Sequence, residues 1–144
     1  FFSEDAEDFK EVKIEKDSIR IPIYSNASAG TGIYGQEDPL DWLELPKSIA
    51  KNATFGTFVK GDSMEPRIYE NDLLLIRTNE ILDTGSIGVF KLNDDIYCKK
   101  FQYNPLTREI TLKSLNPKYD PIRITKEDDF CIIGRVVAVI DYTI

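Results

Sequence analysis

The sequence predicts a mainly β domain built from short strands and a few short helical turns. Runs of β-branched and aromatic residues recur along the chain, and turn-forming residues separate them about every ten positions. The chain has 144 residues, of which 42% are hydrophobic, and this suits one domain with a sizeable core. No internal repeat or low-complexity tract interrupts the pattern. We therefore expect a compact fold of short twisted strands.

The first third of the chain combines a charged arm, a strand and a loop. Residues 1–20 carry seven acids and four bases, and we interpret them as the end of an interdomain linker before a domain over residues 21–144. Alternating isoleucines in "IRIPIY" predict a strand. Small residues then fill "SNASAGTG", which predicts an exposed, adaptable loop over about residues 24–35. "DPLDWLELP" is a short amphipathic piece, and "PKSIAKNA" resembles a turn.

The rest of the chain alternates between strands and turns. "TFGTFVKG" predicts a strand that ends at Gly61, and "SMEPRIYEN" predicts a single helical turn capped by Ser63. "DLLLIRT" predicts a buried strand. "TGSIGVFKLNDDIYCKKFQYN" predicts a hairpin with its turn at residues 93–95. "REITLKSLN" and the long apolar run "FCIIGRVVAVIDYTI" predict the last two strands.

Composition excludes several classes of function. The net charge of −7 argues against direct binding of nucleic acid or of an anionic membrane. No apolar run approaches the roughly 20 residues of a membrane helix. The chain contains no histidine, so Ser-His-Asp triads, Cys-His dyads and most zinc sites cannot form. Any hydrolysis must use Lys, Asp or Glu as its base. We expect Cys98 and Cys131 to be buried free thiols of a cytosolic protein rather than a disulfide.

Ser63, in "KGDSMEP", allows two interpretations. It could be a helix cap whose hydroxyl accepts a hydrogen bond from a free backbone N–H. Alternatively, it could be a nucleophile at a helix N-terminus, where the N–H groups of Ser63 and Met64 form an oxyanion hole. Asp62 and Glu65 are interpreted as solvated residues that complement the helix N-terminus.

Lys99 is the candidate base. Alternate residues of a strand face opposite sides, so in "IYCKKF" Lys99 shares a face with Tyr97 and Phe101, whereas Lys100 points the other way. An ammonium among aromatic side chains loses its proton more easily, and a neutral lysine can deprotonate a serine. The alternative is a surface lysine whose stem covers the aromatic rings.

The order of these features resembles the self-cleaving repressors of the LexA type, a family that includes lambda-type phage repressors and UmuD. The match is carried by "SAG", "VKGDSMEP", "NDLLLI", "GSIGVF", "DDIYCKKF" and "GRVVAVI", and spans roughly residues 19–144. The resemblance implies a mostly β peptidase and dimerisation domain with Ser63 as nucleophile, Lys99 as base and Met64 in the oxyanion hole. It implies self-cleavage between Ala29 and Gly30, and it implies no metal or cofactor.

The resemblance also carries expectations about partners. A family member dimerises through its C-terminal strands, although "CIIGRVVAVI" could equally be core. It binds operator DNA through an N-terminal helix-turn-helix domain, which we expect to be missing from this sequence. In the cytoplasm of a bacterial host, a RecA–single-stranded DNA filament stimulates cleavage during DNA damage, or an antirepressor protein inactivates the repressor instead. We expect contacts of Tyr24 and Ile33 to hold the docked cleavage loop.

Four functions are compared on this basis. A repressor, most like that of a phage, is favoured because its cleavage site is Ala-Gly, whereas UmuD-type polymerase accessory proteins typically carry Cys-Gly. A signal peptidase uses a similar Ser-Lys pair but requires a membrane anchor. A cleavage-inactive dimerisation domain under antirepressor control is the third alternative. Cleavage after Ala29 would distinguish the repressor from this inactive domain.

Overall fold

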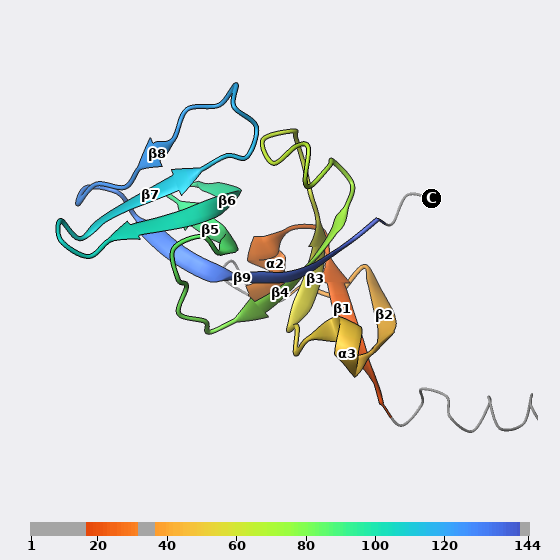
Figure 1. The fold of residues 1–144 in the computed structure, drawn as a ribbon. Helices are drawn as coiled ribbons and strands as arrows, with labels where there is room; N and C mark the ends of the chain where they lie inside the picture. Colours follow the sequence, from red (N-terminus) through yellow and green to blue (C-terminus); the bar gives the residue numbers. More distant parts are fainter. Residues whose placement is uncertain (1–16, 32–36, 142–144) are drawn as a thin grey trace, which may run out of the picture.

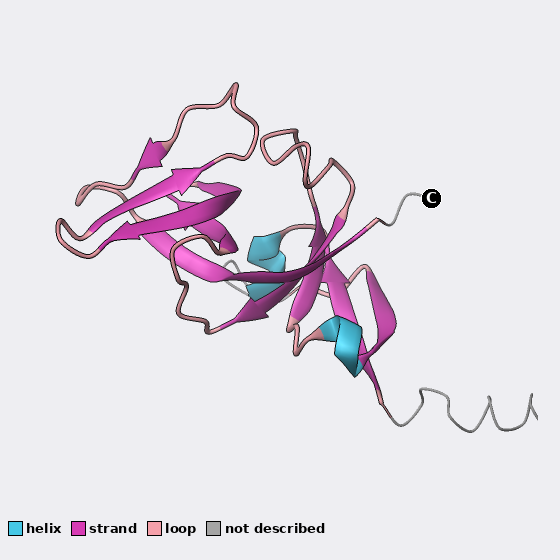
Figure 2. Ribbon diagram, in the orientation of Figure 1, coloured by secondary structure: helices cyan, strands magenta, loops and turns pink. Residues whose placement is uncertain are grey.

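Nine strands form one sheet in the part of the chain that the computed structural model describes, residues 17–31 and 37–141. The strands are β1 (Ser18–Tyr24), β2 (Asp41–Pro46), β3 (Phe55–Phe58), β4 (Leu73–Thr78), β5 (Ile87–Leu92), β6 (Asp95–Asn104), β7 (Glu109–Lys113), β8 (Ile122–Arg123) and β9 (Phe130–Ile140). The other regular elements among the described residues are two short helices, α2 (Ala27–Thr31) and α3 (Lys47–Ala50). The prevalence of strands, visible in Figure 2, confirms the prediction of a mainly β domain.

The long strand β9 joins two parts of this sheet (Figure 1). The spatial order is β2-β1-β3-β4-β9-β5-β6-β7-β8, and each neighbouring pair is antiparallel except β1 and β3. The second half of β9 pairs with β4, and its first half pairs with β5. The candidate nucleophile and the candidate base therefore come from opposite sides of β9, since Ser63 follows β3 and Lys99 belongs to β6.

Strand β4 is buried on both faces. Leu73 and Leu75 pack in one core cluster, and Leu74 and Ile76 pack in a second cluster that also holds Met64. Burial on both faces explains why the strand is a continuous apolar run instead of an alternating one. It confirms the prediction of a buried strand in "DLLLIRT" and ties the residue after Ser63 to the core.

The structure corrects the predicted elements at several boundaries. β1 begins at Ser18, inside the predicted linker, and the hairpin turn is shorter than predicted because Asp95 is already the first residue of β6. The amphipathic piece "DPLDWLELP" contains β2, which pairs with β1. Its apolar period is two, with Leu43 and Leu45 toward the core and Trp42 exposed. The predicted turn in "PKSIAKNA" contains α3.

The two cysteines are free thiols in different surroundings. Cys98 is partly buried against the core, and burial raises the pKa of its thiol to about 12. Cys131 is exposed, so the prediction that both are buried was wrong. The reason is the alternation of β9, in which Phe130 and Ile132 pack against the core and Cys131 faces the opposite side.

Candidate active site

Ser63 lies in the connection between β3 and β4, where a glycine begins a tight turn. Gly61 has a φ of 83°, in the left-handed region that glycine adopts without steric cost. Paired backbone hydrogen bonds close the base of this connection, from Val59 N to Asp72 O and from Asn71 N to Val59 O, both at 2.9 Å. Met64 is only 1% exposed. The turn is therefore anchored at both ends and by the side chain next to Ser63.

The predicted helical turn after Ser63 is a series of tight turns rather than a helix. Glu65 N donates to Asp62 O, and Arg67 N and Ile68 N both donate to Met64 O. Pro66, which follows a cis peptide bond, has no N–H group to extend such a series. Ser63 is consequently not the cap of a regular helix.

Ser63 and Met64 keep their polar groups available. Among the described residues, the Ser63 hydroxyl and the backbone N–H groups of Ser63 and Met64 have no hydrogen-bond partner. A capping serine would use its hydroxyl to accept a bond from a nearby N–H. A nucleophile beside an oxyanion hole needs the opposite arrangement, with its hydroxyl and two N–H groups open to a substrate.

Lys99 is buried in the middle of β6, as its position beside aromatic residues predicts. It is 6% exposed and pairs with Gly88 of β5. Its Nζ atom lies 5.5 Å from the ring centroid of Tyr97 and 5.6 Å from that of Tyr119. Burial of the ammonium lowers the pKa of Lys99, and the neighbouring Cys98 opposes this effect. Lys99 is thus not a solvated surface lysine.

The hydrogen-bond partner of Lys99 is a serine that the sequence did not single out. Lys99 Nζ donates to Ser114 Oγ at 2.6 Å. Within the described part of the chain, Lys99 and Ser63 form no hydrogen bond with each other. Ser114 directly follows β7, which pairs with β6 next to Lys99 through Lys100 and Lys113. The strand pattern in "REITLKSLN" identified β7, but no local signal showed that the residue after it reaches Lys99.

Asp62 is not merely a solvated residue, which corrects the prediction from sequence. Its carboxylate accepts a hydrogen bond from the hydroxyl of Tyr119 and forms an ion pair with Lys118 at 2.8 Å. The hydrogen bond from Lys118 lowers the pKa of Asp62 most, and the hydrogen bond from Tyr119 lowers it further. The residue before the candidate nucleophile is therefore tied to a segment more than 50 positions later in the sequence.

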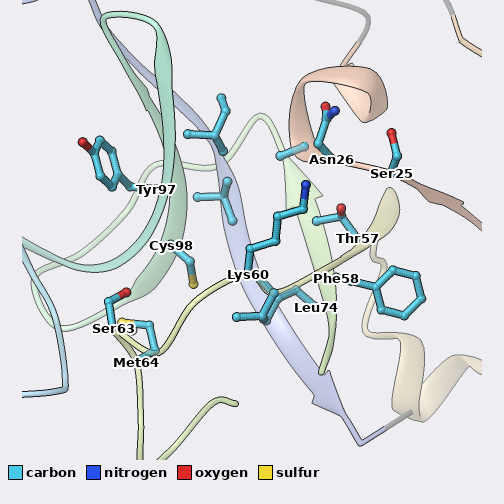
Figure 3. Close-up of a pocket in the computed structure, with 14 residues that line it drawn as sticks. Ser25, Asn26, Thr57, Phe58, Lys60, Ser63, Met64, Leu74, Tyr97 and Cys98 are labelled. Carbon is cyan, nitrogen blue, oxygen red and sulfur yellow. The ribbon is translucent and has the colours of Figure 1, made fainter. Parts of the chain in front are cut away.

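A cavity of about 240 Å³ opens beside Ser63 (Figure 3). Ser63, Met64 and Cys98 border it on one side, and Ser25 and Asn26 border it on the other. The remaining lining residues are Ala27, Thr57, Phe58, Val59, Lys60, Leu74, Val89, Ile96 and Tyr97. The cavity thus joins the candidate nucleophile, the residues around Lys99 and the segment just before the predicted cleavage site.

The predicted cleavage site lies in a buried helix, not in an exposed loop. Ala29 and Gly30 belong to α2, and Ala29 is 7% exposed. Asn26 caps this helix, because its Oδ1 accepts a hydrogen bond from Ala29 N at 2.8 Å. A β-carbon at Gly30 would lie 2.3 Å from a ring atom of Phe55. The small residues of "SNASAGTG" therefore allow close packing, whereas their composition had suggested flexibility.

The structure brings only part of the predicted site together. Ser25, Asn26 and Ala27 line the same cavity as Ser63. Lys99, Ala29 and Gly30 do not line it. Tyr24, which was expected to hold the docked loop, packs against Phe55 in the structure, with ring centroids 6.0 Å apart. Ile33, the other residue expected to hold the docked loop, lies outside the described residues.

Comparisons with known proteins connect this geometry to a family. Residues 22–137 match the family described as Peptidase S24-like. The chain is 30% identical over 130 residues to a LexA repressor of Carboxydothermus hydrogenoformans, with 89% of this chain and 63% of the relative covered. It is 31% identical over 132 residues to a LexA repressor of Acetivibrio thermocellus, with coverages of 90% and 60%.

A LexA repressor of Desulfitobacterium hafniense is 33% identical over 127 residues, with 87% of this chain and 60% of the relative covered. The chain therefore spans about three fifths of the length of these relatives. Among the residues that the structure describes, no helix is long and apolar enough to cross a membrane. Because the family match covers most of the chain, from β1 to β9, this chain belongs to the Peptidase S24-like family.

Proposed function

We propose that this chain is the self-cleaving part of a LexA-like transcriptional repressor and that it cuts its own Ala29–Gly30 bond with Ser63 and Lys99. One observation carries this proposal. A lysine with a lowered pKa is buried directly after Cys98, a residue that shares a cavity with an unpaired serine hydroxyl. Ser-Lys catalysis requires a lysine that loses its proton easily and a serine hydroxyl that is free to attack.

The reaction begins when neutral Lys99 accepts the hydroxyl proton of Ser63. The Ser63 oxygen attacks the carbonyl carbon of Ala29, and the N–H groups of Ser63 and Met64 stabilise the resulting oxyanion. Lys99 then returns the proton to the nitrogen of Gly30 as the Ala29–Gly30 bond breaks. Water hydrolyses the Ser63 ester, with Lys99 again as the base, and restores the free serine.

Two features of the resting arrangement would restrain this reaction. Peptide substrates of proteases bind in an extended form, so α2 would have to unwind before Ala29 reaches Ser63. Lys99 would also have to exchange its contact with Ser114 for one with Ser63. A partner that binds the unwound, docked state more tightly would shift the population toward cleavage. A RecA–single-stranded DNA filament is our candidate for that partner.

At the level of the whole repressor, cleavage would relieve repression during the response to DNA damage. The protein would dimerise through this domain and bind operator DNA through a helix-turn-helix domain on the N-terminal side. The relatives are named LexA repressors, and this chain matches about three fifths of their length, which supports a repressor function. They also favour a repressor over a UmuD-like polymerase accessory protein. A phage origin and the RecA trigger are predictions.

A second function is favoured by a separate observation. Ala29 and Gly30 are held in a buried helix, and Lys99 is bonded to Ser114 instead of Ser63. Both features suit a dimerisation domain that does not cut itself and is controlled by an antirepressor protein. The two functions differ in one outcome, which is whether the chain is ever cut after Ala29.

Intact mass spectrometry of the purified chain tests the proposal. The chain is incubated at neutral pH and near pH 10, together with Ser63→Ala and Lys99→Ala. Exposed Ser48 on α3 and Lys100 on the other face of β6 supply matched controls, Ser48→Ala and Lys100→Ala. We expect a break between Ala29 and Gly30 that is faster at high pH, persists in the controls and disappears in the two site variants. An uncut chain at both pH values would support the dimerisation domain.

A further inference from the structure

A short segment after β7, residues 114–119, contacts both candidate catalytic residues, Lys99 through its ammonium and Ser63 through its backbone carbonyl. Ser114 bonds Lys99, as described above, and Tyr119 lies over the same ammonium. Tyr119 also donates its hydroxyl hydrogen to Asp62, and the neighbouring Lys118 forms an ion pair with that carboxylate. The segment therefore joins the β6 side of the site to the turn that carries Ser63.

Asn116 makes the contacts that bear most directly on the turn. Its backbone N–H donates to Ser63 O at 2.9 Å, and its side-chain Nδ2 donates to Asp62 O at 3.0 Å. These two carbonyl groups are consecutive. Asn116 thus holds the peptide group on each side of the Ser63 α-carbon.

Because each peptide group is planar, these contacts also determine where the N–H groups of the oxyanion hole point. In a planar trans peptide, the C=O and N–H groups point in opposite directions, so fixing one fixes the other. Asp62 O belongs to the same peptide as the N–H of Ser63, and Ser63 O belongs to the same peptide as the N–H of Met64. Asn116 binds both oxygens, and Glu65 N also donates to Asp62 O, so the N–H groups of Ser63 and Met64 point away from Asn116. Those are the N–H groups that have no partner among the described residues.

We propose that Asn116 is a positioning residue that preorganises the oxyanion hole through the carbonyl groups of Asp62 and Ser63. This proposal rests on the proposed self-cleavage. Among the described residues, Asn116 makes no hydrogen bond with Lys99, so its effect would be on stabilisation of the oxyanion and not on deprotonation of the base. Ser114 has the complementary role, because its only side-chain hydrogen bond among the described residues is with Lys99.

The pH dependence of self-cleavage separates these two roles. The first-order cleavage rate of the full chain is measured from neutral to alkaline pH and gives a plateau rate and a midpoint. Asn116→Ala removes the side-chain bond to Asp62 O and keeps the backbone bond to Ser63 O. It should lower the plateau about tenfold or more, since loss of one oxyanion donor costs about a hundredfold in other enzymes. Its midpoint should match that of the unmodified chain. Ser114→Ala should instead move the midpoint to lower pH, because the charged lysine loses an acceptor that stabilises it.

Two further variants test whether a general loss of structure, and not the loss of the Asn116 contact, lowers the rate. Asn104→Ala removes a side chain that likewise accepts backbone hydrogen bonds in a turn, but between β6 and β7, and it should leave plateau and midpoint unchanged. Asn116→Asp keeps the oxygen that accepts from Lys118 N, loses the donor to Asp62 O and adds a negative charge at that position. It should fold and should also have a lower plateau.

Each outcome decides the proposal. A normal plateau in Asn116→Ala and Asn116→Asp would overturn the role of Asn116 and leave the proposed self-cleavage intact. A shifted midpoint in Asn116→Ala would also overturn it, since Asn116 would then act on the base. If the unmodified chain is not cut at any pH, the proposed function fails and this inference fails with it.

Discussion

Gly30 lies so close to Phe55 that a β-carbon at position 30 would be 2.3 to 2.8 Å from three atoms of the ring. The ring is itself 1% exposed and packs in the core cluster that contains Met64. The proposed scissile bond is therefore docked on the same core that supports the turn of the nucleophile. This packing stabilises the resting state, in which the proposed scissile bond is held in α2.

Gly30→Ala should destabilise the folded domain, because the added methyl group would overlap the buried ring of Phe55. Overpacking of this kind costs about 1–3 kcal/mol. The midpoint of thermal unfolding is measured in a Ser63→Ala background, so that cutting does not interfere. A second substitution, Phe55→Leu, makes room for the methyl group, and the two changes together should cost less than their sum. Equal stability of Gly30→Ala and its parent would contradict the described packing.

Asn26→Ala should accelerate self-cleavage. The substitution removes the cap of α2, which is worth about 1 kcal/mol, and so favours the unwound form about fivefold. Cleavage is followed by intact mass at a fixed pH. Asn26→Ser retains a capping side chain and serves as the matched control, with a rate near that of the parent. Slower cleavage in Asn26→Ala would mean that Asn26 contributes more to the cleavage-competent state than to the resting helix.

The two thiols should differ in reactivity. Cys98 is partly buried with a pKa raised to about 12, so it holds almost no thiolate at pH 8, whereas Cys131 is exposed. Alkylation with iodoacetamide, followed by peptide mapping, should therefore modify Cys131 quickly and Cys98 slowly. Cys131→Ser should abolish the fast phase. Two equally fast phases in the unmodified protein would contradict the burial of Cys98.

The sequence predicted those features that local patterns determine. The run of four apolar residues in β4 and the alternation around Lys99 follow from burial on one or both faces of a strand, and both predictions were confirmed. Small residues were ambiguous, because Gly30 suits an exposed loop and close packing on Phe55 equally well. Chemistry-bearing residue types at a recognisable spacing were sufficient to propose Ser63 and Lys99.

Residues that act across long sequence separations could not be predicted. Ser114 is 15 positions from Lys99, and Asn116 is 54 positions from Asp62. Their contacts depend on how β7 pairs with β6 and on where the next segment then runs, and no local period encodes this. The network around Asp62 was missed for the same reason, since an acid in a turn resembles any solvated carboxylate until its partners are known.

The pH–rate profile of self-cleavage, with Lys99→Arg and Lys100→Arg alongside, tests the central claim most directly. Because burial lowers the pKa of Lys99, the neutral base forms below the ordinary lysine value of 10.5. The rate should therefore rise with pH and level off with a midpoint below 10.5 in the unmodified chain and in Lys100→Arg. Lys99→Arg should not cut at any pH, because a guanidinium stays charged. Cutting by Lys99→Arg at the unmodified rate, or a midpoint at or above 10.5, would contradict Lys99 as the base.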